Sequence, residues 1–421
     1  MNSKVDEYTK YCLNCPAKPC SNKGCPLSND IPTFIKYAKE GNIKEAYNVL
    51  LDTTILGSVC GRICPHEKQC EGSCVRGIKG EPVHIGEIES YIFDEAIKNE
   101  YDKKIEKTSE LNNRNIAIIG SGPAGLTASY FLARKGANIT IFEKYDKLGG
   151  ILVHGIPEFR LDKEKVNKTI SQILNLGVNV EYNKELGKNL ELDELEKNYD
   201  AIFLAIGANI PIKMNIEGEE LEGVYGANKL LEYANHPEYV GKTVAVIGGG
   251  NVAMDSARTV KKLGAKEVYV IYRRSKEEMP AEKKEIEDAK REGIQFLFQN
   301  NIVKVIGNNK VEKIECIKTE LIEKQGESRK VPVDIEGSNY QIVVNYILMA
   351  IGSKPEKNIL ENLGVELTDK GYIKINENYQ TSNSKIFAGG DIIGSMQTVA
   401  WAAKDGREAA KKIEKYLKSS I

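Results

Sequence analysis

The sequence predicts an α/β protein with two Rossmann-like dinucleotide-binding domains, preceded by an α-helical, cysteine-rich domain. The first observation is a repeat: a strand, a glycine turn, a helix and a strand follow one another at 115–143 and again at 243–272. Each copy is followed by a matching late strand, at 201–207 and at 346–352. The second observation is that eight of the nine cysteines lie within the first 74 residues, where no alternating strand pattern occurs.

The cysteine-rich part, residues 1–112, is expected to consist of helices around an inorganic site. A helical apolar pattern opens at Ile31 and runs to Leu51, with Gly41 interrupting it. The polar stretch 99–114 then indicates a linker. A domain boundary is therefore expected near residue 112.

The first glycine turn carries a dinucleotide-binding fingerprint. Gly120 permits a tight turn, Gly122 lets a pyrophosphate approach the backbone, and Gly125 lets the helix pack on the strand. The helix N-terminus supplies unpaired N–H donors for the phosphates. Glu143 ends the next strand, 18 residues beyond the last glycine, and is expected to bind the ribose hydroxyls of adenosine. A glycine turn without a ligand is the alternative.

The second glycine turn differs at the position that selects the nucleotide. Gly248 and Gly250 repeat the fingerprint, and Ala253 replaces its last glycine. Arg273 and Arg274 follow the next strand, where the first copy has a carboxylate. Guanidinium groups bind a 2′-phosphate, whereas a carboxylate repels it, so NADP is predicted in preference to NAD. The alternative is a solvated pair of surface cations.

The cysteine spacing is typical of thiolate ligands on short loops. The two groups are Cys12-x2-Cys15-x4-Cys20-x4-Cys25 and Cys60-x3-Cys64-x5-Cys70-x3-Cys74. Such ligands hold iron–sulfur clusters, which pass single electrons. Zinc is the stronger rival, because Cys12 and Cys15 form a C-x2-C pair, although the other spacings suit zinc less. Disulfides are disfavoured by the concentration of cysteines in one segment.

The C-terminal part carries a glycine turn at Gly390 followed by a helical pattern over 400–417. Asp391 on this turn is placed to accept hydrogen bonds from a ribityl chain. The positive end of the following helix is placed to face the pyrimidine edge of a flavin. Gly-Asp turns are also ordinary loop punctuation, so the pattern is only suggestive by itself.

Bulk composition argues against nucleic acid and membranes as partners. The formal net charge is −1, with 28% charged and 41% hydrophobic residues. No net field therefore favours a polyanion or an anionic bilayer. No window reaches the roughly 18 apolar residues that span a bilayer. A cytoplasmic location is expected.

These motifs together resemble the glutamate synthase small (β) subunit family, over nearly the whole chain. The relatives include the N-terminal half of dihydropyrimidine dehydrogenase and the large subunit of NADH-dependent ferredoxin:NADP oxidoreductase. The resemblance rests on both cysteine groups and on four further segments, at 149–161, 248–255, 272–280 and 388–391.

The resemblance implies two 4Fe–4S clusters with interleaved ligands. One is held by Cys12, Cys15, Cys20 and Cys74, and the other by Cys25, Cys64, Cys70 and Glu89. Glu87 is the nearby alternative for the last ligand, and Cys60 matches a family cysteine that is not a ligand. The chain has four residues between Cys20 and Cys25 where relatives usually have three, which alters the loop before Cys25.

The resemblance also implies FAD in the first dinucleotide site and NADPH in the second. The residues implied for FAD are Gly120, Gly122, Pro123, Ala124, Gly125, Glu143, Ile151, Arg160, Leu186, Gly390, Asp391, Thr398 and Val399. Those implied for NADPH are Gly248, Gly250, Asn251, Val252, Arg273, Arg274, Ala350 and Gly352. The expected domains are 1–112 for the clusters, 113–238 and 349–421 for FAD, and 239–348 for NADPH, inserted in the FAD domain.

The function implied is an NADPH-dependent oxidoreductase that passes electrons through FAD and the clusters to a partner. No catalytic acid or base is needed, because the cofactors supply the reactivity. The partner is expected to be a larger catalytic subunit or a ferredoxin-like acceptor, with glutamate synthase as first candidate. Pyrimidine reduction and ferredoxin-linked bifurcation are alternatives.

Two other classes of protein are less favoured. A thiol or disulfide reductase needs a redox cysteine pair beside the flavin, and none occurs after residue 74. A non-enzymatic or zinc-binding scaffold would not need two intact nucleotide fingerprints.

Overall fold

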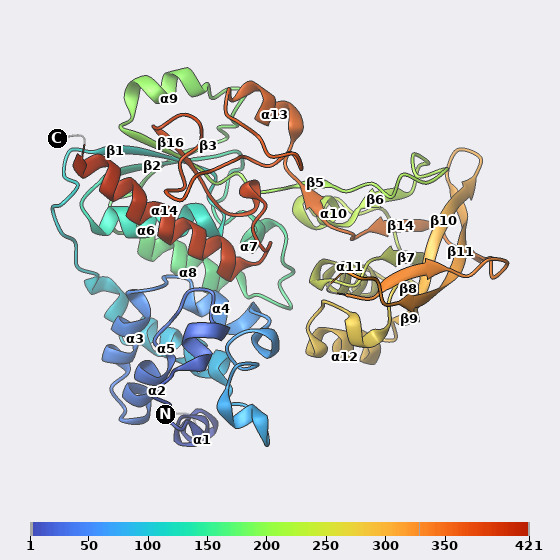
Figure 1. Ribbon diagram of the computed structural model, residues 1–421, viewed down its shortest axis with the longest axis horizontal. Helices are drawn as coiled ribbons and strands as arrows, with labels where there is room; N and C mark the ends of the chain where they lie inside the picture. Colours follow the sequence, from blue (N-terminus) through green and yellow to red (C-terminus); the bar gives the residue numbers. More distant parts are fainter. Residues whose placement is uncertain (1–2, 328, 420–421) are drawn as a thin grey trace. The chain divides into compact units, whose positions relative to one another are not determined.

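The computed structural model describes residues 3–327 and 329–419. The chain folds into two compact units, shown in Figure 1. The first comprises Met1–Val153, Glu158–Ala208 and Pro355–Ile421, and the second comprises His154–Pro157 and Asn209–Lys354. The second unit is thus an insertion in the first.

The unit bounds differ from the domain bounds expected from the sequence. Residues 209–238, assigned above to the first FAD part, lie in the second unit. The reason is that β6 (Val224–Gly226) pairs in parallel with β14 (Tyr346–Met349) of the second unit's sheet. The separation of 1–112 from the first α/β part stays a prediction.

The cysteine-rich segment is helical, and no strand occurs in its described residues 3–114. The expected helical run from Ile31 to Leu51 is present and breaks at Gly41, whose φ is +77°. Phe34, Tyr47 and Phe93 are buried at the centre of these helices. The elements are α1 (Ser3–Tyr11), the π-helix η1 (Cys20–Gly24), α2 (Ile31–Lys39), α3 (Ile43–Leu51), α4 (Gly57–Ile63), η2 (His66–Lys68), η3 (Val75–Ile78), α5 (Ile85–Lys98) and η4 (Tyr101–Lys104).

The first α/β part is a five-stranded parallel sheet in the order β16-β4-β1-β2-β3. Its edge strand β16 comes from the chain after the insertion, so the sheet joins the two halves of the unit. The long helix α14 runs beside α6 (Figure 1). The strands are β1 (Asn115–Ile119), β2 (Asn138–Glu143), β3 (Asn179–Tyr182), β4 (Ala201–Leu204) and β16 (Ile386–Ala388). The helices are α6 (Pro123–Arg134), α7 (Ile151–His154), α8 (Lys163–Leu174), α9 (Leu192–Asn198), α13 (Lys357–Asn362), η6 (Asp391–Ile393) and α14 (Val399–Ser419).

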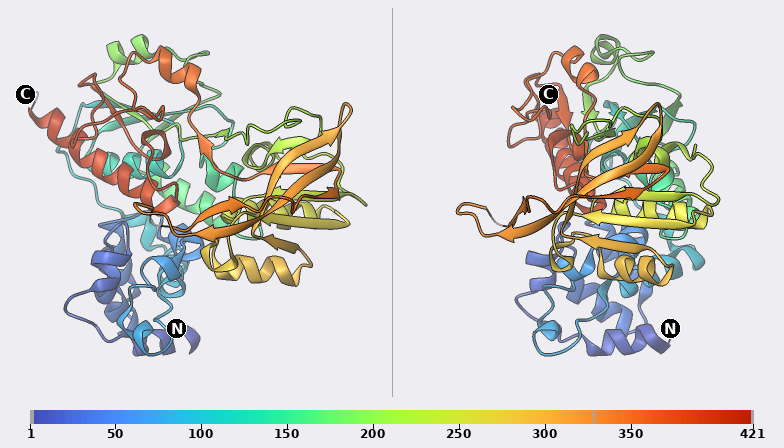
Figure 2. Two further views of the ribbon diagram at one scale, coloured as in Figure 1. Left: turned by 45° about the vertical axis from the view of Figure 1, so that its right-hand side comes forward. Right: turned by 90° about the vertical axis from the view of Figure 1, so that its right-hand side faces the viewer.

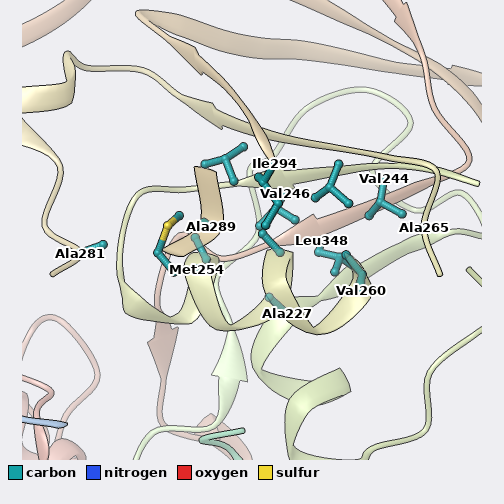
Figure 3. Close-up of a cluster of buried hydrophobic side chains, with 14 of the residues drawn as sticks. Ala227, Val244, Val246, Met254, Val260, Ala265, Ala281, Ala289, Ile294 and Leu348 are labelled. Carbon is teal, nitrogen blue, oxygen red and sulfur yellow. The ribbon is translucent and has the colours of Figure 1, made fainter. Parts of the chain in front are cut away.

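The second unit repeats this design, with a parallel sheet in the order β6-β14-β7-β8-β9. Figure 3 shows part of the core of this unit, to which Val246, Leu348 and Met254 belong. The further elements are β5 (Ile210–Pro211), α10 (Ala227–Tyr233), β7 (Thr243–Ile247), α11 (Asn251–Lys262), β8 (Glu267–Tyr272), η5 (Lys276–Glu278), α12 (Lys283–Arg291), β9 (Gln295–Phe298) and β15 (Ser353–Lys354).

The second unit also contains an antiparallel sheet that the sequence analysis does not predict. Its strands are β10 (Asn300–Gly307), β11 (Val311–Ile322), β12 (Val331–Asp334) and β13 (Tyr340–Val343). One face packs on the parallel sheet through Ile302, Val305 and Ile314. The β11–β12 hairpin reaches beyond the other strands (Figure 2).

Among the described residues, no helix combines the length and the apolar character that crossing a membrane requires.

Candidate functional site

The first glycine turn, between β1 and α6, forms an open cradle. Gly120 has a φ of +96°, which favours glycine. A Cβ on Gly125 would lie 2.0 Å from the carbonyl oxygen of Gly120, so the helix packs directly on the turn. A Cβ on Gly122 would meet no atom within 4 Å. Pro123 and Ala124 begin α6, whose first N–H groups face this open space. The cradle fits a pyrophosphate.

Glu143 lies at the end of β2, beside this turn, and is 3% exposed. Its Oε2 accepts hydrogen bonds from the amide of Ser121 at 3.0 Å and from the Ser121 hydroxyl. Its Oε1 accepts one from the amide of Tyr145 at 3.0 Å. The carboxylate is therefore fixed next to the pyrophosphate cradle, where an adenosine ribose would be bound. Ser121, which the sequence analysis does not single out, holds it there.

The C-terminal glycine turn closes over the same cradle. A Cβ on Gly390 would lie 3.1 Å from the Cβ of Ala124 in α6. The Gly390 amide donates to Asp405 Oδ2 at 3.2 Å. Asp391 has a buried Oδ1 with no hydrogen-bond partner in the described residues. Burial raises the pKa of Asp391 to about 6, and the neighbouring Asp405 adds to the effect. This unsatisfied acceptor fits a hydroxyl-bearing group such as a ribityl chain.

The remaining residues implied for FAD also belong to the first unit. Ile151 begins α7, and Leu186 is buried and bridges to Leu190. Arg160 lies between α7 and α8. Thr398 caps α14, its hydroxyl accepting from the Trp401 amide at 3.5 Å, and Val399 is the first residue of that helix. Their binding of FAD stays a prediction.

The second glycine turn, between β7 and α11, has the same form. Gly248 has a φ of +138°, and a Cβ there would lie 2.3 Å from the Ala350 carbonyl oxygen. A Cβ on Gly250 would meet no atom within 4 Å. Asn251 begins α11, and its side-chain Oδ1 accepts from the Glu282 amide at 3.0 Å. The structure thus forms a second open cradle. Val252 follows in α11, and Gly352, after β14, has a φ of +117°.

Arg273 and Arg274 follow β8 at the side of this second cradle. Arg273 is exposed, and Arg274 is half-buried with its Nε donating to the Lys330 carbonyl at 3.0 Å. The β11–β12 hairpin brings Arg329 to the same place, donating to the Tyr272 hydroxyl at 3.1 Å. Because Arg329 is 57 residues from Tyr272 in the sequence, no local pattern predicts this third cation.

The first cysteine group surrounds one pocket. Cys12, Cys15, Cys20 and Cys74 all line it, and Ile31, Ile35 and Val83 are among its apolar walls. Burial raises the pKa of Cys20 to about 11 and also raises that of Cys12. Bare thiolates are thus disfavoured here, and a bound cation would stabilise them.

The second cysteine group lies deeper, with Glu89 among its members. Cys25, Cys64 and Cys70 each have a pKa that the charge of Glu89 raises further. Burial raises the pKa of Cys25 to about 12 and that of Glu89 to about 8. The structure therefore brings together the four residues implied for the second cluster.

The alternative ligand, Glu87, lies on another face of α5. Its side chain is 48% exposed and pairs with Lys4 at 3.1 Å. Glu89 is 5% exposed. Cys60 is buried beside Cys64, and Cys316 is fully buried in β11 of the second unit. Of the two carboxylates, Glu89 is therefore the one that lies with the thiols of the second group, and its role as a ligand stays a prediction.

The extra residue between Cys20 and Cys25 forms a π-helical turn. The Cys25 amide donates to the Cys20 carbonyl at 2.8 Å, an i to i−5 hydrogen bond. A Cβ on Gly24 would lie 2.8 Å from the Cα of Cys70, so the turn packs against the second group. The π-helical turn accommodates the extra residue, and Cys25 still lies close enough to Cys70 and Glu89 to interact with them electrostatically.

The first group's thiols surround a space with apolar walls, which a cluster would fill. Thiolates are also the ligands that usually hold iron–sulfur clusters in proteins.

Comparisons with known proteins agree with this arrangement. Residues 114–406 match the family described as pyridine nucleotide-disulphide oxidoreductase. Residues 2–101 match the family described as dihydropyrimidine dehydrogenase domain II, 4Fe-4S cluster.

Three individual proteins illustrate the similarity. The glutamate synthase [NADPH] small chain of Escherichia coli is 36% identical, over 96% of this chain and 90% of its own length. The NADP(+)-dependent formate dehydrogenase subunit beta of Moorella thermoacetica is 35% identical over 95% of this chain and 60% of its own. The structure of Mycobacterium tuberculosis FprA in complex with NADPH shares the fold, with a TM-score of 0.65, 20% identity, and coverage of 73% of this chain and 85% of its own.

These matches span both the cysteine-rich segment and the two glycine turns. The chain therefore belongs to the glutamate synthase small-chain family of pyridine nucleotide-disulphide oxidoreductases.

Proposed function

We propose that this chain takes electrons from NADPH through FAD and two 4Fe–4S clusters and delivers them to a partner protein. The observation that carries the proposal is the presence of two open glycine cradles together with two separate groups of buried and half-buried thiols. When bound, FAD accepts hydride from NADPH, and the clusters carry electrons onward one at a time.

The residues around the first cradle would bind and orient FAD. The N-terminus of α6 would hold the pyrophosphate, and Glu143 the adenosine ribose. Asp391 would accept from the ribityl chain, because its buried oxygen lacks a partner. The first N–H groups of α14, after Thr398, would favour negative charge on the flavin.

The residues around the second cradle would bind NADPH. The N-terminus of α11 would hold its pyrophosphate, and Arg273 and Arg274 its 2′-phosphate. Their task is binding and orientation of the nicotinamide, which needs no acid or base from the protein.

The partner is proposed to be a larger subunit of a glutamate synthase. Support comes from the small-chain relative, which the chain covers over 90% of its length. In that assembly, the electrons would serve the transfer of glutamine amide nitrogen to 2-oxoglutarate. A ferredoxin-like acceptor or a formate-linked assembly is the second candidate, because a similar relative is named as a formate dehydrogenase subunit.

A diaphorase assay tests the proposed function. The purified chain should oxidise NADPH anaerobically with a one-electron dye as acceptor. It should not reduce a small disulfide, because Cys316, the sole cysteine after residue 74, is fully buried. Disulfide reduction at a rate comparable to dye reduction would contradict electron delivery through the clusters.

Replacing Glu89 with alanine should perturb one cluster and leave the other intact. The charge of Glu89 raises the pKa of Cys25, Cys64 and Cys70 alike, so Glu89 lies near all three thiols, whereas the first group has four thiols of its own. We expect iron content to fall by up to half and one of two cluster EPR signals to change. Glu87→Ala is the matched control, because Glu87 is exposed. Unchanged spectra for Glu89→Ala would exclude it as a ligand.

Replacing Asp391 with asparagine should stabilise the apoprotein while weakening FAD binding. The folded-state pKa of about 6 lies above the ordinary value of 3.8, so ionisation costs folding stability as pH rises through this window. The loss of folding stability caused by ionised Asp391 is complete above about pH 6. We expect a higher apoprotein melting temperature for the variant at pH 7, and a difference that shrinks towards pH 4. A constant difference across this range would contradict the burial of an ionised Asp391.

A further inference from the structure

Helix α14 connects the first glycine cradle to the second cysteine group through one buried cation, Arg407. The Arg407 side chain is 6% exposed. Its Nη1 donates to the carbonyl of Leu27 at 2.6 Å and to the carbonyl of Thr53 at 3.2 Å. Both carbonyls belong to the cysteine-rich segment, more than 350 residues away in the sequence. All of these residues lie in the first unit.

Leu27 belongs to the tight turn that carries Cys25. The Ser28 amide donates to the Cys25 carbonyl at 2.9 Å, and Ser28 has a φ of +53°. Arg407 binds a carbonyl within this turn and so limits how it tilts.

The second carbonyl leads to Glu89. The Thr53 hydroxyl donates to Asn29 Oδ1 at 2.7 Å, and Asn29 Nδ2 donates to Glu89 Oε1 at 3.1 Å. Asn29 is 2% exposed and Glu89 is 5% exposed, so water does not replace either residue in the hydrogen bond between them. A shift of the Thr53 backbone would thus pass to the carboxylate. Arg407 therefore contacts the Cys25 turn through the Leu27 carbonyl, and it contacts the start of the hydrogen-bond chain to Glu89 through the Thr53 carbonyl.

The charge of Arg407 is largely balanced by its neighbour. Its Nε and Nη2 each lie 2.9 Å from Glu408 Oε1, and Glu408 also pairs with Lys411 at 3.0 Å. A balanced pair has a weak long-range field. The main effect of Arg407 on the second group is therefore positional, through its hydrogen bonds to the two carbonyls.

The preceding residues of α14 lie against the first cradle. A Cβ on Gly406 would lie 2.2 Å from the Ala124 carbonyl oxygen, at the start of α6. Asp405 accepts from the Gly390 amide. Three consecutive residues of one helix thus contact the pyrophosphate cradle, the C-terminal glycine turn and the Cys25 turn.

We infer that Arg407 is a positioning residue that holds the Cys25 turn and, through Thr53 and Asn29, the Glu89 carboxylate in place, so that its removal shifts the reduction potential of the second cluster. The potential of a cluster depends on how its ligands and the groups hydrogen-bonded to them are placed. The inference rests on the proposed function, because it requires a cluster at Cys25, Cys64, Cys70 and Glu89.

The test is an EPR-monitored redox titration of the full-length protein carrying its cofactors, with Arg407→Met and Arg407→Lys compared with the unmodified chain. We expect a shifted midpoint potential for one cluster in Arg407→Met, a smaller shift in Arg407→Lys, and no shift for the other cluster. The flavin absorbance spectrum should stay the same. If Arg407→Met no longer assembles the second cluster, the midpoint potential measured in Arg407→Lys decides the test.

Arg134→Met is the matched control. Arg134 comes from α6 and also donates to a carbonyl of the cysteine-rich segment, that of Leu51 at 3.2 Å, but it does not contact the Cys25 turn. Unchanged potentials in both Arg407 variants, or an equal shift in Arg134→Met, would overturn the inference. Failure of the proposed function would be recognised separately, because the unmodified chain would then show no cluster signals at all.

Discussion

Gly122→Val is expected to yield a folded chain that no longer retains FAD. The position has a φ of −67° and ψ of −177°, which valine adopts readily, and a Cβ there meets no protein atom within 4 Å. The added methyl groups would occupy the space into which the pyrophosphate must fit. Overpacking of this kind costs about 3 kcal/mol, or about a hundredfold in affinity. The measurement is flavin content after purification, with circular dichroism to confirm folding.

Gly250→Val is the matched variant in the second unit. Gly250 also has extended backbone, with a φ of −90° and ψ of 179°, and a Cβ there is equally unobstructed. This protein should remain yellow, but NADPH should no longer bleach it at concentrations that suffice for the unmodified chain. Loss of flavin from Gly250→Val, or retention of flavin by Gly122→Val, would reverse the assignment of the two cradles.

Replacing both Arg273 and Arg274 with glutamine should weaken the binding of NADPH far more than the binding of NADH. Charge-assisted hydrogen bonds contribute about 1.5–3 kcal/mol each, so two lost contacts to a 2′-phosphate correspond to at least about a hundredfold in KM for NADPH. NADH lacks this phosphate and should change by no more than about threefold. Steady-state dye reduction with both nucleotides measures the ratio.

Arg291→Gln serves as the control for this pair. It is an exposed arginine of α12 in the same unit, paired with Asp288. This variant should leave the KM for both nucleotides unchanged. Equal losses for NADPH and NADH in the Arg273 and Arg274 variant would contradict the 2′-phosphate assignment.

The parts of the fold that sequence reasoning predicts are those with local signals. A strand, a glycine turn and a helix are contiguous, so Gly120 and Gly248 predict both α/β parts. The antiparallel sheet is missed although local signals for it exist, because Gly307, Asn308 and Asn309 mark a turn and β11 alternates polar and apolar residues. The second unit's early start at Asn209 is missed because its cause is the pairing of β6 with a strand far downstream.

The same distinction between local signals and contacts of distant segments applies to the candidate site. Glu89 is preferred to Glu87 through the family resemblance, and helical periodicity favours the same residue, because Ile85, Ile88 and Ile92 mark a buried face of α5 that includes residue 89. Arg329 and Arg407 could not be found in this way. Each reaches its site through a contact between segments more than 50 residues apart, for which a single sequence has no pattern.

The most direct test of the account is anaerobic purification followed by titration with NADPH, monitored by absorbance and EPR. Iron, sulfide, zinc and flavin are measured on the same sample. The account predicts about eight iron atoms and one FAD per chain, with NADPH bleaching the flavin and electrons appearing on the clusters. Zinc in place of iron, or a flavin that NADPH does not reduce, would contradict it.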